Sequence, residues 1–506
     1  MRLLVQLVVA SASAIACAWA FPPAPLPLLA WVAYVPLLVI LRRAASVPGA
    51  LLLAWTWLTI FAWNVGSWLP RSVSRYYDQP TLVGVAFFFG VSTGMAGLYY
   101  MVFAAMYRRL SRLPAWIVPG MAAAAWVTVE FGRAALLTGN PWGLTGYSQV
   151  AWTPVVQMAD VTGVYGITFA VLLLNAAFAE MWLARADPSR RHPALATLIV
   201  AGALVVVVVV YGQVRLAAPM ADGPTTRVAV AQGNLDVGSQ WRATFYGVHL
   251  DTYLRLTDEV LRASGASLIV WPEGAMTFFL DQEPLYRRAI SRIIARHGAH
   301  LVTGGPHAEG DPAEFNNAAF LAAPDGTVVA RYDKQHLLPF AEYFPLRGME
   351  SLQRRFGRMK EFTPGRPSPP LPTPAGLAGI LICNETFYGD IAATRVRDGA
   401  ELLIALANDS WVADPQFSAI VFDMVRLRAV EERRWIVRAS TSGPSGLIDP
   451  YGRVTVRTAD AVPDVLWGDV RAQHGRTVYA RVGDAFAWGC VAVTLVGLLV
   501  ARSRGA

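Results

Sequence analysis

The sequence predicts two kinds of structure in one chain: an α-helical membrane domain of about eight spans, and an α/β domain built from layers of sheet and helix. Of the 506 residues, 55% are hydrophobic and 15% are charged, which is too apolar for an ordinary soluble protein. The apolar residues are spread unevenly, because residues 1–215 and 485–501 contain long stretches almost free of charge. We therefore expect a transmembrane domain at 1–215, a soluble domain at 224–480, and a final span with its tail at 484–506.

The membrane domain is predicted from segment length, since a spanning helix needs about 20 apolar residues. The segments that are long enough lie near 3–20, 23–41, 49–69, 82–106, 114–134, 163–184, 194–212 and 484–501. Residues 1–20 also fit a cleaved signal peptide, because Arg2 precedes an apolar run and Ala18-Trp-Ala20 resembles a cleavage site. Cleavage there would not invert the topology of the remaining chain.

The arginines predict the orientation of these spans, because basic loops stay in the cytoplasm. Arginines follow every second span: Arg42, Arg43, Arg108, Arg109, Arg112, Arg185, Arg190, Arg191, Arg502 and Arg504. Both termini are therefore expected in the cytoplasm and the soluble domain outside it, although Arg71 and Arg75 count the other way. The net charge of +8 does not indicate nucleic acid, because the basic residues gather at the ends of apolar segments.

One polar group near membrane depth permits two interpretations. Glu130 and Arg133 are three residues apart, so they can pair on one helix face, and Trp142 and Tyr147 follow soon after. The group is either an interfacial ion pair within an aromatic belt or a wall of a lipid headgroup site. The sequence leaves both interpretations open.

The soluble domain is predicted to alternate strands and helices. Expected strands are 226–232, 266–271, 300–304, a hairpin at 317–331, 377–383, 402–407, 435–440 and a final hairpin around 449–452. Expected helices are 244–264, 283–297, 387–398 and 416–433. Strands this apolar, alternating with helices, indicate sheets that are covered by helices.

Three chemically reactive residues follow apolar strands of this domain: Glu273, Lys334 and Cys383. A thiol, a carboxylate and an ammonium at strand ends are the parts of a cysteine acyl-transfer site. Cys383 also precedes a predicted helix, whose positive end would favour the thiolate. The other cysteines, Cys17 and Cys490, lie in apolar spans, so no disulfide framework is expected.

Four segments around these residues resemble the nitrilase, or carbon–nitrogen hydrolase, superfamily. They are Trp271-Pro-Glu273, Tyr332–Glu342, Cys383-Asn-Glu385 and Asn408-Asp-Ser-Trp411. With its many spans, Gly139-Asn-Pro-Trp142, Gly146-Tyr-Ser-Gln149 and Gln232-Gly-Asn234, the whole chain is similar to the membrane-embedded branch of that superfamily, the apolipoprotein N-acyltransferase family.

The resemblance implies an αββα sandwich on an eight-helix base, with Cys383 as nucleophile, Glu273 as general base and Lys334 as oxyanion stabiliser. Glu342 would orient Lys334 or assist proton transfer, and Glu385 would brace the turn that carries the thiol. Substrate contacts are expected at Trp241, on an arm near the lipid, and at Trp142, Tyr147, Phe340 and Trp411. No metal or organic cofactor is implied.

The resemblance also implies a reaction and a location. A phospholipid, expected to be phosphatidylethanolamine, would donate a fatty acyl chain through a Cys383 thioester to the N-terminal amine of a diacylglyceryl-modified lipoprotein. The enzyme would lie in the bacterial cytoplasmic membrane with its catalytic domain in the periplasm. Because one chain carries all three reactive residues, a monomer is expected.

The sequence departs from the family pattern at a few positions. Asn384 stands where the family often has an aromatic residue, so it is a candidate supporting residue that changes one wall of the acyl pocket. After Trp411 the chain has Val412-Ala413 and Gln416-Phe417, where the family tends to have Phe-Gly and a Gln-His pair. These departures concern the acyl and acceptor preferences more than bond making.

Two rival functions also fit parts of the sequence. A membrane-tethered amidase of the same superfamily would use the same three residues but would let water attack the thioester; a mere anchor would not need eight spans. A transporter would place paired ionisable groups and broken helices at the bilayer centre of several spans, and only the region of Glu130 and Arg133 comes close.

Overall fold

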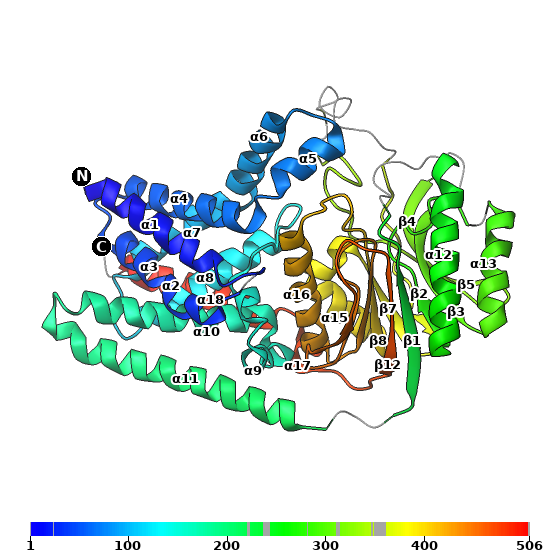
Figure 1. Cartoon of the computed structure of the whole chain (residues 1–506). Helices are drawn as coiled ribbons and strands as arrows, with labels where there is room; N and C mark the ends of the chain where they lie inside the picture. The colour runs from blue at the N-terminus through cyan, green and yellow to red at the C-terminus, as the bar shows by residue number, and fades with distance from the viewer. Residues whose placement is uncertain are drawn as a thin grey trace. The chain divides into compact units, whose positions relative to one another are not determined.

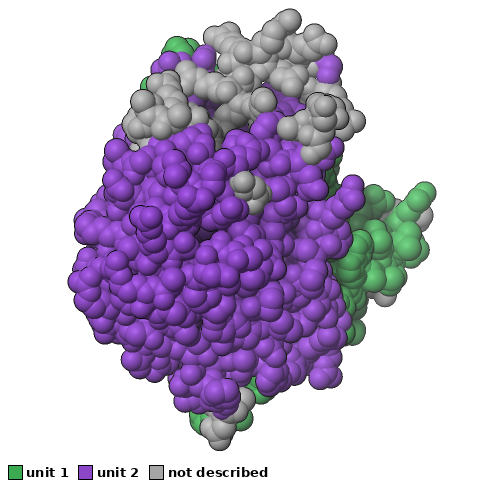
Figure 2. Space-filling model, turned by 90° about the vertical axis from the view of Figure 1, so that its right-hand side faces the viewer, with its two compact units in different colours: residues 1–70, 80–219, 482–506 green, residues 71–79, 220–481 purple. Residues whose placement is uncertain are grey.

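The computed structural model describes residues 2–23, 25–219, 223–235, 243–280, 282–309, 314–345, 348 and 361–503. The chain forms two compact units, coloured separately in Figure 2. Unit 1 comprises residues 1–70, 80–219 and 482–506, and unit 2 comprises residues 71–79 and 220–481. The short segment 71–79, which the sequence analysis assigned to the membrane domain, therefore packs with the α/β domain.

Unit 1 is helical, with helices in each of the eight predicted places (Figure 1). Its helices are α1 (Arg2–Ala18), α2 (Ala30–Ala33), α3 (Val35–Arg43), α4 (Val47–Gly66), α6 (Thr81–Val91), α7 (Leu98–Leu110), α8 (Val118–Ala135), α9 (Thr153–Val156), α10 (Ala159–Leu183), α11 (Arg191–Ala217) and α18 (Ala485–Ser503). A π-helical turn, Ser92–Gly97, joins α6 to α7.

Five helices of the described residues are long and apolar enough to cross a membrane: Val47–Gly66, Thr81–Leu110, Ala159–Leu183, Pro188–Ala217 and Ala485–Ser503. The other three predicted spans fall short for identifiable reasons. The apolar helix Leu3–Ala18 is shorter, and the segment 23–41 is divided into pieces, with Pro36 at the start of α3. Charged Glu130 and Arg133 lie in the last turns of α8. The count of eight spans stays a prediction.

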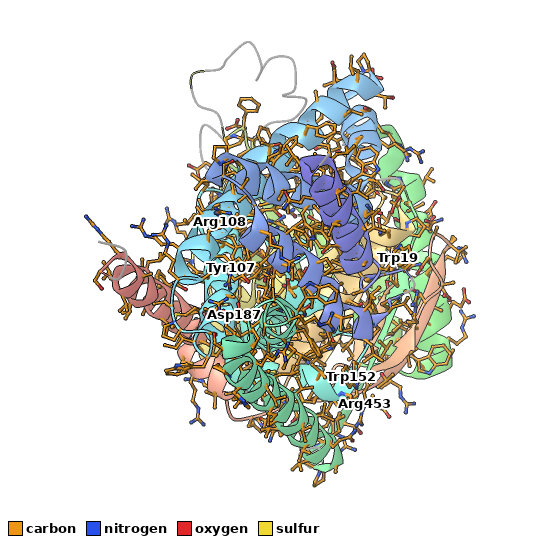
Figure 3. The ribbon with its side chains drawn as sticks, turned by 90° about the vertical axis from the view of Figure 1, so that its left-hand side faces the viewer. Trp19, Tyr107, Arg108, Trp152, Asp187 and Arg453 are labelled. Atoms are coloured by element: carbon orange, nitrogen blue, oxygen red, sulfur yellow. The ribbon has the colours of Figure 1, made fainter. Side chains whose placement is uncertain are left out.

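Arginine side chains tie several helix ends of unit 1 together. Arg42 at the end of α3 forms an ion pair with Glu180 near the end of α10. Arg108 near the end of α7 donates from Nη1 to the carbonyl oxygen of Ala44 (2.7 Å). Arg190 Nη1 lies 3.9 Å from Glu180 Oε2, and its Nε lies 3.7 Å from a carboxylate oxygen of nearby Asp187. Arg108 and Asp187 are labelled in Figure 3. These basic ends therefore lie on one side of unit 1.

Unit 2 is built on two six-stranded sheets, in the orders β12-β1-β2-β3-β4-β5 and β11-β10-β9-β8-β7-β6. The strands are β1 (Thr225–Gln232), β2 (Leu268–Val270), β3 (His300–Glu309), β4 (Glu314–Ala322), β5 (Val328–Asp333), β6 (Leu371–Thr373), β7 (Gly376–Ile382), β8 (Leu402–Ala407), β9 (Ile436–Ser440), β10 (Gly446–Ile448), β11 (Val454–Arg457) and β12 (Asp464–Arg471).

Helices cover the outer face of each sheet. Side chains of α12 (Ala243–Ser264) and α13 (Pro284–His297) share a core with β1 to β4. Those of α15 (Gly389–Arg397) and α16 (Pro415–Glu432) share a core with β7, β8 and β9. The predicted αββα sandwich is therefore confirmed, and the expected helices match α12, α13, α15 and α16 closely.

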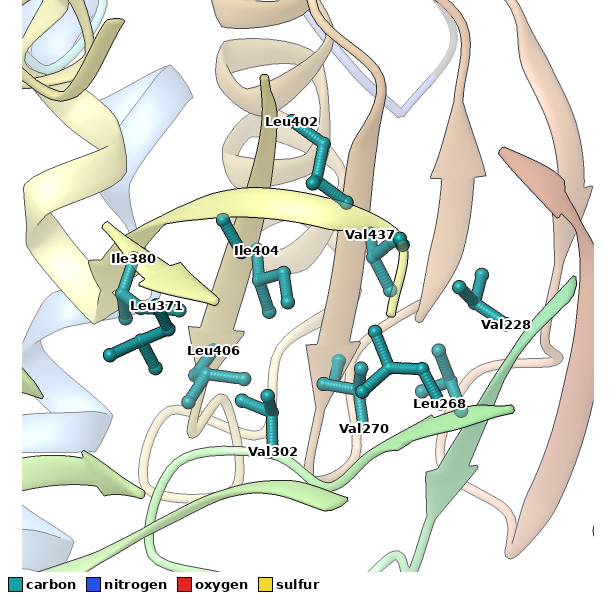
Figure 4. Packing of buried hydrophobic residues seen from close by; sticks show 14 of the residues in the cluster. Val228, Leu268, Val270, Val302, Leu371, Ile380, Leu402, Ile404, Leu406 and Val437 are labelled. Carbon is teal, nitrogen blue, oxygen red and sulfur yellow. The ribbon is translucent and has the colours of Figure 1, made fainter. Parts of the chain in front are cut away.

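The two sheets pack face to face through a shared apolar core, part of which Figure 4 shows. Because successive residues of a strand point to opposite faces, Val228 and Val230 enter this core, whereas Ala229 and Ala231 face the helices. Each fully buried aliphatic side chain stabilises the fold by about 1.5–3 kcal/mol. This core holds the strand ends that carry the reactive residues.

Two strands were not predicted. β12, Asp464–Arg471, pairs antiparallel with β1, and its charged and half-exposed residues weaken the apolar signal of a strand. β6, Leu371–Thr373, lies in a proline-rich run, yet it pairs with β7 because it is an edge strand, where proline is tolerated. In both strands tertiary pairing outweighs local propensity.

Candidate active site

The three predicted catalytic residues lie just past the ends of strands of unit 2. Glu273 follows β2, Lys334 directly follows β5, and Cys383 directly follows β7. The fold brings them together, with Lys334 Nζ 4.0 Å from Glu273 Oε1 and the Cys383 thiol close enough to both for their charges to act on its pKa. Their roles in catalysis stay a prediction, but their convergence is a property of the structure.

The backbone position of Glu273 is fixed by the buried Trp271 before it and by the neighbouring strand β3. Trp271 is fully buried and donates from its backbone N–H to Val302 (2.8 Å) and from Nε1 to Thr257 Oγ1 (2.8 Å). Gly304 of β3 passes so close that a Cβ on it would lie 2.7 Å from the Glu273 Cα. A glycine is therefore required beside the carboxylate.

Both oxygens of the Glu273 carboxylate accept a hydrogen bond. Asn317 Nδ2 donates to Oε1 (2.7 Å), and the backbone N–H of Asn408 donates to Oε2 (2.9 Å). Burial raises the pKa of Glu273 to about 7, against the opposing pull of Lys334 and with repulsion from Glu342. A carboxylate with a pKa near neutrality can both accept and return a proton at physiological pH.

Lys334 is almost fully buried but remains an ammonium. Burial by itself lowers its pKa, yet the carboxylate of Glu342, which pairs with the ammonium, and the carboxylate of Glu273 outweigh burial, and the pKa is raised above that of a free lysine. The backbone N–H of Lys334 donates to Asn317 O (2.8 Å) on β4, which anchors its position. A fixed cation beside the thiol is suited to stabilise an oxyanion.

Cys383 is half-buried and has a left-handed backbone with φ of 54°. A non-glycine residue in this conformation is strained, and such strain is common at functional turns. The predicted thiolate is wrong for the resting site: burial, and then the charge of Glu273, raise the thiol pKa well above its usual value. The turn after Cys383 is a short 3₁₀ segment, Cys383–Phe387, and α15 begins only at Gly389, so a long helix dipole does not act on the sulfur.

Glu342 is the nearest carboxylate to the lysine. Its Oε2 lies 2.8 Å from Lys334 Nζ and accepts a hydrogen bond from Leu338 N (2.7 Å). Its Oε1 accepts from Asn317 Nδ2 (2.8 Å). These contacts agree with the expectation that Glu342 orients Lys334.

Glu385 is fully buried behind the thiol turn. Its Oε2 accepts from Ile382 N (2.8 Å), next to the nucleophile. Its Oε1 accepts from Tyr332 Oη (2.8 Å), Gln335 N (2.9 Å) and His336 N (3.1 Å). Glu385 therefore joins the strand end that carries Cys383 to the segment that follows Lys334; its role in bracing the thiol turn stays a prediction.

Asn384, the departure from the family pattern, is 2% exposed. Neither its Oδ1 nor its Nδ2 has a hydrogen-bond partner among the described residues. Phe340 and Trp411 are half-buried in the same unit, and Phe340 has a left-handed φ of 65°. The substrate contacts expected of Phe340 and Trp411 stay predictions.

The remaining expected substrate contacts lie elsewhere. Trp142 and Tyr147 belong to unit 1, where Tyr147 is buried and Trp142 Nε1 donates to Val65 O (2.9 Å). Nearby Glu130 is fully buried and accepts from Thr145 N (2.9 Å). Trp241 lies outside the described residues. Whether any of these residues contacts lipid stays a prediction.

Asn317 is a site residue that the sequence analysis missed. Its Nδ2 donates to both Glu273 and Glu342 and so links the two carboxylates. A signal was present, because asparagine is unfavourable in strands and this one precedes the apolar run Ala318–Ala322. In the described part of the chain, no group of three His, Cys, Asp or Glu side chains could hold a metal ion.

A thiol, a carboxyl group with a pKa near 7 and a buried ammonium, all on an αββα sandwich, define a cysteine-dependent enzyme of the carbon–nitrogen hydrolase class. Residues 227–479 match the carbon-nitrogen hydrolase family, and residues 13–177 match the apolipoprotein N-acyltransferase N-terminal domain. The chain belongs to the apolipoprotein N-acyltransferase family.

Curated relatives support this assignment over nearly the full length. The apolipoprotein N-acyltransferase of Geobacter metallireducens is 33% identical, covering 97% of this chain and 94% of its own. That of Gloeobacter violaceus is 30% identical, covering 96% and 92%. A solved amidase of Nesterenkonia AN1, from the nitrilase superfamily, is 20% identical with a TM-score of 0.40, covering 54% of this chain and 99% of its own.

Proposed function

We propose that this protein transfers a fatty acyl chain from a membrane phospholipid, through a thioester on Cys383, to the N-terminal amine of a diacylglyceryl-modified lipoprotein. The observation that carries this proposal is the convergence of Cys383, Glu273 and Lys334 in a chain of this family.

The first stage forms the thioester. Glu273 accepts the thiol proton as the Cys383 sulfur attacks the ester carbonyl of the phospholipid. The charge that develops on the carbonyl oxygen is stabilised by the Lys334 ammonium. When the intermediate collapses, the ester C–O bond breaks, and Glu273 returns the proton to the departing lysophospholipid alcohol.

The second stage forms the amide. The neutral amine of the lipoprotein attacks the thioester carbonyl, and the carbon–sulfur bond breaks. Glu273 accepts a proton from the amine and passes it to the sulfur, which restores the thiol. Because an amide is more stable than the ester that supplied the acyl chain, the overall transfer is favourable.

For the donor we propose the sn-1 chain of phosphatidylethanolamine, on the basis of the family resemblance. The many apolar helices support lipid substrates, because they confine the donor and a lipid-anchored acceptor to the same bilayer. We also propose a monomer, because unit 2 of one chain supplies Cys383, Glu273 and Lys334.

The proposed location is the cytoplasmic membrane, with unit 2 in the periplasm. Contacts of Arg42, Arg108 and Arg190 tie basic helix ends to one side of unit 1, and basic loops favour the cytoplasm. The number of membrane crossings between segment 71–79 and residue 220 supports the same location, because four crossings would return the chain to the side from which it started. Both belong to unit 2, so the helices between them must cross an even number of times.

Three helices in that interval are long and apolar enough: Thr81–Leu110, Ala159–Leu183 and Pro188–Ala217. α8 then becomes the fourth crossing, in spite of Glu130 and Arg133. An even number of crossings is also consistent with the position of Arg71 and Arg75, which are exceptions to the rule that basic loops face the cytoplasm. Their segment packs with unit 2, so we place it in the periplasm with that unit.

The test is to incubate the purified full chain with phosphatidylethanolamine vesicles and to analyse the intact protein by mass spectrometry. An acyl adduct on Cys383 is expected, and the adduct should disappear when a diacylglyceryl lipopeptide is added, with the triacyl lipopeptide as product. Cys383→Ser should abolish the adduct, whereas Cys490→Ser should retain it.

A wild-type thiol that stays unmodified with several phospholipids would overturn the proposal. Loss of the adduct to water alone, without transfer to the lipopeptide, would favour the amidase alternative.

A further inference from the structure

The segment Arg71–Gln79 forms part of the catalytic unit although it lies between two helices that are long and apolar enough to cross a membrane, Val47–Gly66 and Thr81–Leu110. It contains most of helix α5 (Leu69–Tyr77). Ser72, Val73 and Tyr77 are buried, whereas Arg71 and Arg75 are exposed. The segment therefore has one buried face, and its two arginines lie on the exposed face.

The end of α5 is built to hold Tyr76 and Tyr77 in a defined direction. Asp78 adopts a left-handed backbone with φ of 53°, and the N–H of Gln79 donates back to Ser74 O (2.9 Å). This bond is the closing bond of a Schellman motif, which satisfies the last carbonyls of a helix. The two tyrosines are thus carried by a capped helix end.

Both tyrosines contact the turn that carries Glu342. Tyr77 Oη donates to the carbonyl oxygen of Phe340, and Tyr76 Oη lies 3.5 Å from the carbonyl oxygen of Ala341. The Tyr76 ring also packs edge-on against Trp411, with ring centroids 6.0 Å apart. The segment therefore contacts the loop Leu338–Tyr343 at successive backbone carbonyls.

The contacted loop needs support. Phe340 has a strained left-handed backbone, with its N–H donating to Tyr343 O (2.7 Å). The same loop holds Glu342 through Leu338, whose N–H donates to Glu342 Oε2 (2.7 Å). Since Glu342 Oε2 also binds Lys334, a relaxed loop would release the lysine from its carboxylate.

We propose that Tyr76 and Tyr77 are positioning residues for acyl transfer, which hold the loop Leu338–Tyr343 so that Glu342 keeps Lys334 away from Glu273. This inference rests on the proposed function. If the loop relaxes, Lys334 turns from Glu342 toward Glu273, which neutralises the base and withdraws the cation from the oxyanion.

Among the described residues, the charged and titratable groups that interact with Glu342 include Lys334, Glu273, Cys383, His336 and Tyr76. Of these, Lys334 is the group whose position depends on the loop. Tyr76 is kept protonated by burial and by the charge of Glu342, which raise its pKa to about 12, so it does not titrate in the working range.

The test is the rate of Cys383 acylation from phosphatidylethanolamine vesicles, measured from pH 5 to 9 with the full chain. In Tyr77→Phe, which keeps the ring, the rate at pH 8 is expected to fall roughly tenfold. The pH at which the acylation rate begins to fall on the acidic side, called the acidic limb of the profile, is expected to move about one unit lower. The reason is that a Lys334 ammonium nearer to Glu273 lowers the pKa of Glu273. Tyr76→Phe should produce the same changes in smaller measure.

Two controls separate positioning from general damage. Tyr451→Phe changes a buried tyrosine of the same unit and should leave both rate and pH profile unchanged. In a Glu342→Gln background, Tyr77→Phe should add no further loss, because the carboxylate through which it acts has been removed.

An acylation rate and pH profile equal to wild type in Tyr77→Phe would overturn the inference, as would full additivity with Glu342→Gln. Failure of the wild type to form the adduct would instead overturn the proposed function. Thus the two proposals fail by different observations. If Tyr77→Phe folds poorly, the pH profile of Tyr76→Phe decides the question.

Discussion

Lys334 is ion-paired with Glu342, its Nζ 2.8 Å from the Oε2 atom. The same nitrogen stands 4.0 Å from Glu273 Oε1, so the ammonium neutralises one carboxylate and leaves the other available as a base. This unequal sharing allows a cation that stabilises an oxyanion and a carboxylate that accepts a proton to coexist in one buried site.

The rate of Cys383 acylation should rise with pH and level off above about pH 7. Burial raises the Glu273 pKa to about 7, so below that pH the carboxyl is protonated and cannot accept the thiol proton. Single-turnover acylation of the wild type, followed by intact-protein mass spectrometry, measures the profile. Glu273→Gln should lose this limb together with most of the activity, roughly 10²- to 10⁴-fold. A wild-type rate independent of pH between 5 and 8 would contradict the assignment.

Glu342→Gln should shift the acidic limb to lower pH and reduce the plateau. Without the Glu342 charge, Glu273 loses a repulsive neighbour and gains Lys334 as its closest partner; both effects lower the Glu273 pKa. The reduction should be about tenfold or more, because the oxyanion donor is displaced as well. Glu309→Gln, which changes an exposed carboxylate paired with Arg331 on the first sheet, is the matched control and should behave as wild type.

Asn317→Asp should move the acidic limb in the opposite direction, to higher pH. Asn317 Nδ2 donates to both Glu273 and Glu342, and an aspartate there replaces the donor by a third negative charge. The Glu273 pKa should rise by about one unit or more, so acylation at pH 7 falls but recovers at pH 9. A downward shift, or no recovery at high pH, would show that Asn317 does not control the base.

Glu385→Ala should destabilise the catalytic unit and abolish acylation. The substitution leaves buried donors of Ile382, Tyr332, Gln335 and His336 without their acceptor, at a cost on the order of 3 kcal/mol or more. The midpoint of thermal unfolding should fall by roughly 5–10 °C, as measured on the solubilised protein.

Glu401→Ala is the matched control for that variant, because Glu401 accepts a hydrogen bond from Leu377 at the other end of β7 but is partly exposed. It should lower the midpoint much less and retain acylation. Equal losses in the two variants would remove the special role assigned to Glu385.

Much of the fold follows from local pattern. Val228 and Val230 alternate with Ala229 and Ala231, which is enough to predict a buried strand, and the apolar run before Cys383 predicts β7. Edge strands such as β12 were missed, because their stability comes from pairing with β1 and not from their own apolar residues.

The candidate site also has features that the sequence predicts and features that only the tertiary structure reveals. Glu273, Lys334 and Cys383 could be chosen from the sequence because each follows an apolar strand. The protonation of Cys383 could not, since it depends on burial and on a carboxylate more than 100 residues away in the chain. Nor did the sequence indicate that Tyr77 reaches the loop of Glu342 across 263 residues of sequence separation.

By itself, the sequence determined the apolar helices, the strand and helix layers, and the reactive residues at strand ends, because hydrophobic periodicity and strand termination are local properties of the chain. Only the tertiary structure decided which carboxylate binds Lys334, how Asn317 joins two carboxylates, and that residues 71–79 belong to the catalytic unit. Those features depend on distance and burial among segments far apart in the chain, which no local pattern encodes.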